Sequence, residues 1–371
     1  MSNNLTQFDH YLADDGPAAL VVREHLMPVE GADGVFFPAT YAASEDKTFK
    51  GGYNIDKFDD GANVTLVDSI GSQANRIEPL FKTGDYAALV PQIIIKAGDK
   101  EINLLDVGHR AGDAIVRYSS LQSELQAAFK ALLGGNAAPL AKIAPTSLVF
   151  GVWDSRDTQA KAPRLIASTI RAYDVKSLTR SAQYWAGGSS APVTVYDDEK
   201  VLGPIPEGKE SKKETDARSN CGFTHVPATA THGGVIAGEK GIVRTATLAL
   251  AALRLLKSSD GENGEATKNL RRYILGLALV AFTKLPGGYL RQGTILVGNG
   301  DSKFEEIAVN GKRTDATLTH ETALKYAQAA AVAFGIKAEK EKREKAPVPF
   351  DVKAAKTAIE TAKKKKSAAT V

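Results

Sequence analysis

Two long apolar stretches constrain the fold of this chain more than any other feature. Residues 242–257 and 266–282 are apolar on nearly every side. A helix without a polar face has to be covered by other elements all around. The longest apolar runs, such as Tyr273 to Phe282, are far shorter than the roughly 20 residues that a membrane span needs. The two stretches therefore predict helices buried in the core of a large soluble domain that has no membrane partner.

Strands and amphipathic helices are predicted around these two helices. Runs of apolar and β-branched residues predict strands at 17–28, 146–153, 164–175 and 289–297, and a hairpin over 91–107 that turns at Gly98-Asp99. Apolar stripes predict helices at 68–81, 119–133 and 319–335, the first of them capped by Asp68 or Ser69. The mixture of Gly, Pro and charge in 186–236 predicts a flexible loop or insertion. Strands that alternate with packed helices are typical of an α+β domain with inserted loops.

The net charge of the chain is a poor guide to its partners. The 371 residues sum to +4, but residues 337–371 hold 11 basic and 5 acidic residues, so the remaining 336 sum to −2. A nucleic-acid site must therefore depend on a local patch. The tail itself is predicted to be a basic, partly helical or disordered extension. A single cysteine, Cys221, and a polar, acidic N-terminus without a secretory signal predict a cytoplasmic protein.

Residues 148–184 form such a local patch. Its acids are only Asp154, Asp157 and Asp174, whereas its basic residues are Arg156, Lys161, Arg164, Arg171, Lys176 and Arg180. Hydroxyl and amide side chains, among them Gln159 and Ser168, stand between the basic residues. Guanidiniums interleaved with neutral donors suit a repeating polyanion, because each phosphate accepts both kinds of donor. A solvated loop between two strands is an equally good interpretation of this spacing. If 164–175 is a regular strand, Arg164 and Arg171 face opposite sides of it.

Two further segments carry candidate phosphate ligands. On the 68–81 helix, Ser72, Asn75 and Arg76 project opposite the apolar stripe, and Ser69 and Ser72 lie at the N-terminus, which attracts phosphate. An ordinary capped surface helix is the alternative. His109-Arg110 follow a predicted strand end and could clamp phosphate, although a solvated loop is the simpler interpretation. The six histidines show no ligand spacing with Cys221 or with carboxylates, so we expect no metal and no cofactor.

Long motifs of the chain resemble a known family. VFGVWDSRDTQAKAPRLIASTIRAYDV (149–175), followed by LTRSAQY, is similar to the backbone RAMP subunit of the type I-U/I-G CRISPR surveillance complex, Cascade. VDSIGSQANRIEPLF (67–81), LLDVGHRAGDAIVRYSSL (104–121), GIVRTATLALAALRLL (241–256) and GGYLRQGTILV (287–297) recur in that family in the same order. The resemblance covers most of residues 15–300.

The resemblance implies a fold and a function. It implies one domain over residues 1–336, a ferredoxin-like, RNA-recognition-type palm with thumb and web insertions at about 29–66, 84–145 and 186–236. It also implies a non-catalytic subunit that polymerises head to tail along the CRISPR guide RNA, next to the other Cascade subunits. Such a subunit grips the sugar-phosphate backbone and presents the bases to target DNA in antiviral defence. In that family the helix that corresponds to 68–81 touches the guide.

The candidate RNA-binding residues combine this resemblance with the spacing of polar side chains. They are Ser69, Ser72, Asn75, Arg76, His109, Arg110, Arg156, Gln159, Lys161, Arg164, Ser168, Arg171, Arg180 and Arg244. The chain has no strand that resembles KGFGFVxF, so stacking of bases on aromatic residues of the sheet is not expected.

Two alternative functions and one further residue role stay open. The first alternative is an endoribonuclease of the same superfamily that processes CRISPR RNA with His109 or His25 as acid-base, although Gly287–Arg291 is short and not markedly basic for its glycine-rich loop. The second is a generic single-stranded RNA-binding protein that forms no filament. Related type III subunits cut RNA with a loop aspartate, yet Asp154 stands beside Arg156 without a partner base, which favours a structural or arginine-orienting role.

Overall fold

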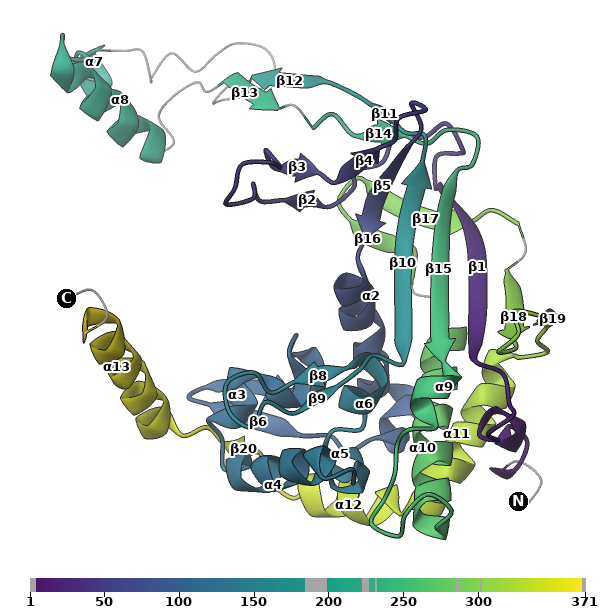
Figure 1. Cartoon of the computed structure of the whole chain (residues 1–371). Coiled ribbons are helices and arrows are strands. Elements are labelled where there is room, and N and C mark those ends of the chain that lie inside the picture. Colours follow the sequence, from purple (N-terminus) through teal and green to yellow (C-terminus); the bar gives the residue numbers. More distant parts are fainter. Residues whose placement is uncertain are drawn as a thin grey trace.

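The centre of the molecule is a curved antiparallel sheet of nine strands (Figure 1). The computed structural model describes residues 5–183, 199–221, 227–230, 232–284, 287–300 and 302–368. The strand order is β16-β17-β1-β15-β10-β5-β4, and the β18-β19 hairpin also pairs with β1. These strands are β1 (Ala19–Pro28), β4 (Ile55–Lys57), β5 (Asn63–Asp68), β10 (Ile166–Tyr173), β15 (Ile242–Ala249), β16 (Tyr289–Arg291), β17 (Thr294–Gly298), β18 (Lys303–Ile307) and β19 (Arg313–Asp315).

The central strand β15 corrects the prediction of a helix over 242–257. Only Leu250–Leu253 form a helix there, α9, whereas Ile242–Ala249 pair with both β1 and β10. Ile242, Val243 and Thr245 are β-branched and favour a strand. Burial alternates from Arg244 onward, but no residue of the strand is exposed, so the sequence lacks the clear polar face of a half-exposed strand.

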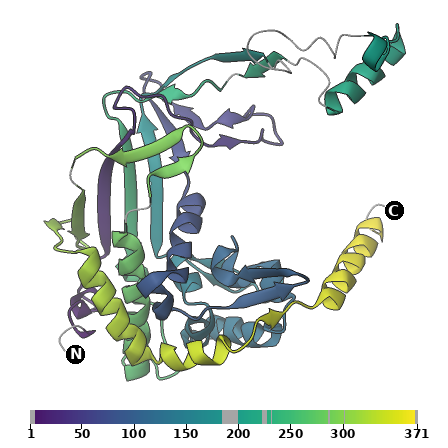
Figure 2. The ribbon, with the colours of Figure 1, turned by 180° about the vertical axis from the view of Figure 1, so that it is seen from behind.

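A layer of helices covers one end of the sheet (Figures 1 and 2). Its longest members, α10 (Glu265–Thr283) and α11 (His320–Phe334), confirm the helices predicted at 266–282 and 319–335. A Cβ on Gly276 of α10 would lie 2.8 Å from the Cα of Ala327, so the close approach of these two helices requires glycine. The remaining helices of the layer are α2 (Ile70–Ile77), α3 (Ala114–Arg117), α4 (Gln122–Leu133), α5 (Ala138–Ile143), α6 (Thr146–Phe150) and α12 (Ile336–Arg343). Among the described residues, no helix has the length and apolar character needed to cross a bilayer.

Two predicted strands are interrupted in ways that the sequence explains. The segment 146–153 is not one strand: Pro145 precedes α6, and Gly151, at φ +82°, ends it before β8 (Val152–Trp153). The segment 289–297 is a hairpin of β16 and β17, because Gly293 adopts φ +74° between them. Glycine reaches such positive φ values without strain, so both turns depend on it.

Smaller elements complete the fold. The predicted hairpin over 91–107 is confirmed as β6 (Ile94–Ala97) and β7 (Lys100–Asn103). The other short strands are β2 (Thr40–Tyr41), β3 (Gly52–Tyr53), β9 (Lys161–Ala162), β11 (Lys176–Ser177), β12 (Arg180–Gln183), β13 (Pro227–Ala230), β14 (Val235–Ile236) and β20 (Val348–Pro349). Within the predicted loop 186–236, residues 186–198, 222–226 and 231 lie outside the described residues, and α7 (Glu199–Leu202) and α8 (Lys209–Asn220) are helical. The tail contains the helix α13 (Val352–Ala368).

Candidate nucleic-acid interface

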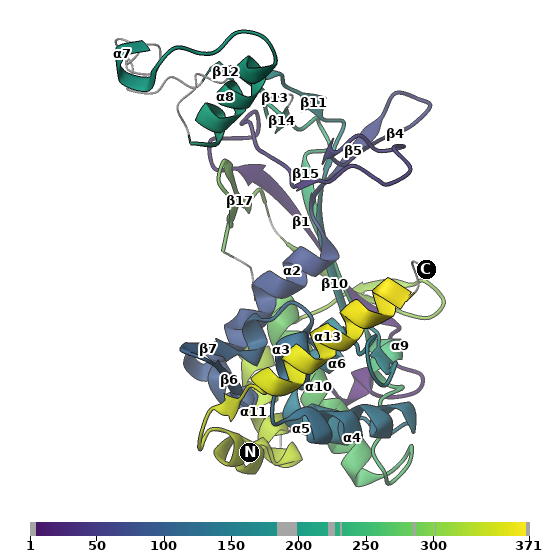
Figure 3. The same ribbon diagram turned by 90° about the vertical axis from the view of Figure 1, so that its left-hand side faces the viewer.

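A groove of about 410 Å³ lies between the β8-β9 hairpin and the loop at His109. Helix α2 borders it: a Cβ on Gly71 would lie 4.0 Å from Arg164 Nη2, and one on Gly108 would lie 3.6 Å from Asn75 Nδ2. Figure 3 looks onto α2 from the concave side of the ribbon. The groove is lined by Gly108, His109, Arg110, Gly151, Val152, Trp153, Ser155, Lys161, Ala162, Pro163 and Arg164. The structure thus brings together residues from three predicted segments: the 68–81 helix, His109-Arg110 and the basic patch 148–184.

Apart from Pro163, the exposed side chains of this groove are basic or aromatic. Lys161 and Arg164 are exposed, Trp153 is 57% exposed, and the side chain of His109 is 86% exposed. None of the described residues that line the groove is acidic. Asp113 lies close by, with its Oδ2 3.4 Å from Nδ1 of His109. The groove therefore presents fixed positive charge next to an aromatic surface.

Arg110 lines the base of the groove but is almost completely buried. Its side chain is ion-paired with Glu78, and its Nη1 and Nη2 donate to the carbonyl oxygen of Gly151 and to Oδ1 of Asn75, both at 3.3 Å. The guanidinium also lies over the ring of Phe150, 5.4 Å from its centroid. This corrects the prediction that Arg110 is free to contact RNA: the residue braces α2 against the strand ends.

A buried carboxylate, Asp68, organises the exposed face of α2. It accepts hydrogen bonds from Ser72 Oγ (2.8 Å) and Gln73 Nε2 (2.6 Å), and from Nε of Arg76 and Nη2 of Arg291 at 3.2 and 2.9 Å. Ser69 caps the helix as predicted, with its Oγ 3.3 Å from the amide of Ser72. Asn75 and Arg76 remain exposed. The sequence did not reveal Arg291, which lies within a strand (289–297) that was predicted only for its apolar residues.

The loop that follows Trp153 is held by Asp154. Its carboxylate is buried and accepts hydrogen bonds from the amide and Oγ1 of Thr158, at 2.8 and 2.7 Å. Arg117 Nη2 donates to the same carboxylate at 3.0 Å and to the carbonyl oxygen of Gly112 at 2.9 Å. These contacts agree with a structural role for Asp154, although its partner is Arg117 and not the adjacent Arg156. Arg156 and Gln159 are exposed in this loop.

Ser168 and Arg244 belong to the interior and line no part of this groove. Arg244 is ion-paired with Glu24, and its Nη1 donates to Ser168 Oγ at 3.4 Å. Ser168 in turn donates to Gln73 Oε1 at 3.1 Å. All of these side chains are buried, which corrects the prediction that Ser168 and Arg244 contact RNA.

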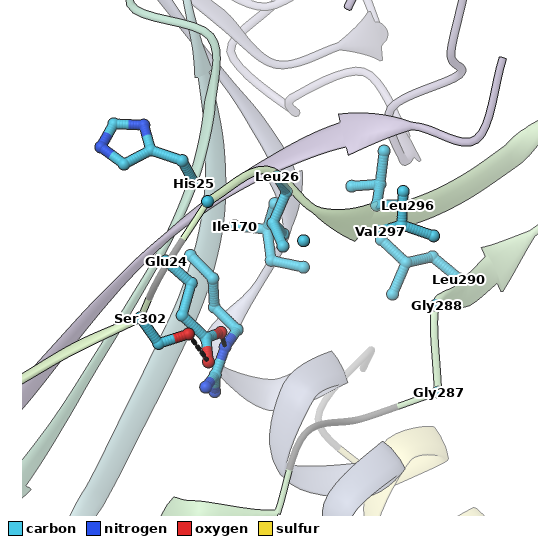
Figure 4. Close-up of a pocket in the computed structure, with 13 residues that line it drawn as sticks. Glu24, His25, Leu26, Ile170, Gly287, Gly288, Leu290, Leu296, Val297 and Ser302 are labelled. Atoms are coloured by element: carbon cyan, nitrogen blue, oxygen red, sulfur yellow. Dashed lines mark hydrogen bonds and ion pairs between the residues drawn. The ribbon is translucent and has the colours of Figure 1, made fainter. Parts of the chain in front are cut away.

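A second cavity, of about 320 Å³, lies beside the Glu24–Arg244 pair. In Figure 4, Glu24 and Ser302 lie at one end, where Ser302 donates to Glu24, and Leu26, Ile170 and Leu296 form an apolar part. His25 lines this cavity, whereas His109 lines the groove. The two histidines considered as alternative acid-base groups therefore lie in different cavities.

The last predicted contacts lie along β10 and β12. Arg171 is exposed on β10, and its Nη1 donates to Thr169 Oγ1 at 2.7 Å. Arg164 comes before the first residue of β10, Ile166, so the alternation expected between Arg164 and Arg171 does not apply. Arg180 is on β12, and its side chain lies outside the described part of the chain.

The chain was compared with known protein families and with curated proteins. Residues 20–177 match the family model of the CRISPR-associated protein GSU0053. The matched segment begins in β1, ends with β11 and includes every residue that lines the groove. No curated protein matches the chain. Over this segment, which is less than half of the chain, the protein is similar to a CRISPR-associated family, in agreement with the motifs of its sequence.

Proposed function

We propose that this protein is the repeated backbone subunit of a type I-U/I-G CRISPR complex and binds the sugar-phosphate backbone of the guide RNA. The observation that carries the proposal is the groove in which Lys161 and Arg164 lie next to the exposed ring of Trp153 at the border of α2. Phosphates attract such cations whatever the base sequence. Sequence selection then belongs to base pairing between guide and target DNA.

The order of the strands supports a ferredoxin-like palm. The four strands β1, β10, β15 and β17 occur in the chain in that order and lie in the sheet as β17-β1-β15-β10, with every neighbouring pair antiparallel. Helices lie between β1 and β10, and α10 lies between β15 and β17. This is the arrangement of a βαββαβ unit. We assign the long connection between β10 and β15, which contains α7 and α8, to the thumb.

We propose a binding role without catalysis. The carboxylate of Asp154 is buried among Thr158 and Arg117, which leaves it poorly placed to act on a bound strand. His25 and His109 line different cavities. General acid-base cleavage requires groups within hydrogen-bonding reach of one reacting bond.

Charge supports assembly of the copies head to tail. Residues 1–60 hold 11 acidic and 4 basic residues, a net charge of −7, whereas residues 156–180 hold six basic and two acidic residues. Complementary surfaces at different places on one subunit produce a heterologous interface, which propagates as an open helix. Such complementarity accelerates assembly and is screened by salt.

The proposal is tested by mixing the purified protein with single-stranded RNAs of increasing length and measuring the native mass. We expect the mass to rise in steps of one 39.4 kDa subunit, and the affinity to fall steeply with salt. One subunit per RNA at every length would instead identify a generic RNA-binding protein. A defined cleavage product from repeat RNA would identify the processing endoribonuclease.

A further inference from the structure

A tryptophan stands exposed on the wall of the basic groove. Trp153 is 57% exposed, although tryptophan is usually buried to a large degree. One exposed apolar side chain is ordinary on a protein surface and needs no explanation by itself. The neighbours of Trp153 make it unusual, because Lys161 and Arg164 line the same groove.

The backbone of Trp153 is held rigidly. Trp153 pairs with Lys161 in the β8-β9 ladder, and the next residue donates its amide to the carbonyl oxygen of Ala160 at 2.9 Å. On the other side, a Cβ on Gly112 would lie only 2.9 Å from the carbonyl oxygen of Trp153, so the two backbones are in close contact. A ring attached to a fixed backbone segment loses little conformational freedom when a ligand binds, which favours affinity.

One cation lies over the ring, and a second lines the same groove. Lys161 Nζ lies over the ring of Trp153, 5.7 Å from its centroid. Arg164 follows Lys161 by three residues, and its guanidinium lies beside Gly71 at the start of α2. A ligand that combines a flat ring with negative charge matches this arrangement.

We propose that Trp153 is a stacking platform for one nucleobase of the bound RNA, with Lys161 and Arg164 holding the flanking phosphates. This inference rests on the proposed RNA-binding function and deepens it by assigning one nucleotide to one side chain. Trp153 lies on a separate two-stranded hairpin, so the site differs from the aromatic strand of an RNA-recognition sheet, which the sequence lacks. Every base has a π-face, so the platform requires a base but does not select which one.

The test compares oligouridine with an abasic ribose-phosphate strand of equal length, because only the first can stack. The protein carries a Trp185→Phe substitution, which leaves Trp153 as its single tryptophan. We expect oligouridine, but not the abasic strand, to quench the tryptophan emission. Trp153→Ala should weaken binding of oligouridine about 5- to 150-fold, the range for loss of one stacked base, and leave binding of the abasic strand unchanged. Trp153→Phe should restore most of the affinity.

Phe58→Ala is the matched control. Phe58 is 55% exposed and lies in the turn before β5, at the opposite end of that strand from α2. Its substitution should leave the affinities for oligouridine and for the abasic strand unchanged. The stacking role is overturned if Trp153→Ala leaves oligouridine binding intact or weakens both strands equally. If the parent protein binds neither strand in a salt-dependent manner, the proposed RNA-binding function fails together with the stacking role.

Discussion

Arg110 Nε lies 2.7 Å from Glu78 Oε2 in the protein interior, directly below the groove that carries the exposed cations. The exposed fractions of the two side chains are only 4% and 1%. Burial raises the pKa of Glu78 to about 7, although the charge of Arg110 opposes this shift. The cost of taking the two charges out of water is thus large, and their attraction offsets it only while both are present.

Arg110→Ala is therefore expected to lower the free energy of unfolding by about 3–5 kcal/mol, because it leaves the carboxylate of Glu78 without its partner. Replacement of both residues, Glu78→Leu with Arg110→Met, should lower the free energy of unfolding by less than Arg110→Ala alone. Urea unfolding of the three proteins measures these differences. A stable Arg110→Ala variant that no longer binds RNA would instead place this guanidinium on the ligand.

Arg164→Ala is expected to weaken binding to all single-stranded RNA sequences to a similar degree. Each phosphate contact of a single strand contributes about 0.7 to the slope of log K against log salt, so the slope should become smaller by that amount. Lys312→Ala, in the exposed turn between β18 and β19, serves as the control and should change neither quantity. An unchanged slope for Arg164→Ala would contradict a phosphate contact.

Asp154→Ala is expected to destabilise the protein by about 3 kcal/mol, since it removes the partner of Arg117 and the acceptor for Thr158. Neither this variant nor the parent should cleave target RNA paired with the guide. Thermal unfolding and gel analysis of labelled RNA provide the two readouts. Cleavage by the parent that disappears in Asp154→Ala would show that this aspartate is catalytic.

His320 is expected to make stability depend on pH. It joins two helices, because its Nδ1 and Nε2 lie 2.8 Å from Thr283 Oγ1 and Tyr86 Oη. Burial, and then the charge of Lys284, lower its pKa below the ordinary value of 6.5. The unfolded chain therefore takes up the proton first, and the free energy of unfolding should fall as the pH drops below about 6.5. His320→Gln should flatten this dependence. An identical pH profile for the two proteins would exclude His320 as its cause.

The elements that local sequence determines were predicted well. Ser69 caps α2, although the helix ends at Ile77, because the chain continues as a 3-10 helix over Glu78–Lys82 with Pro79 in its first turn. The turn at Gly98 and the helix that ends at Gly134 were also found. Caps, glycines and prolines act on their immediate neighbours, so a short stretch of sequence reveals their effect.

The elements and contacts that depend on distant residues were missed. Glu24 and Arg244 are directly opposite one another in the β1–β15 ladder, but 220 residues separate them in the chain. Nothing near Arg244 in the sequence indicates that its charge has a buried partner. The same holds for Arg291, which reaches Asp68 across 223 residues. Arg110 and Arg244, which lie near functional motifs, were therefore assigned to a ligand, although both are paired with carboxylates in the interior.

The pairing of β1 with late strands has a consequence for synthesis on the ribosome. Ala19 is opposite Ala249, and the other partners of β1, β17 and β18, come later still. At about 5–20 residues per second, the 230 residues between the two alanines take about 12 to 46 s to translate. During that time both edges of the apolar strand β1 have no permanent partner and are prone to aggregate. Fragments that stop before residue 242 are thus expected to be insoluble. β10, which follows the groove residues in the chain, also pairs with β15, so the sheet next to the groove is completed only after β15 has emerged.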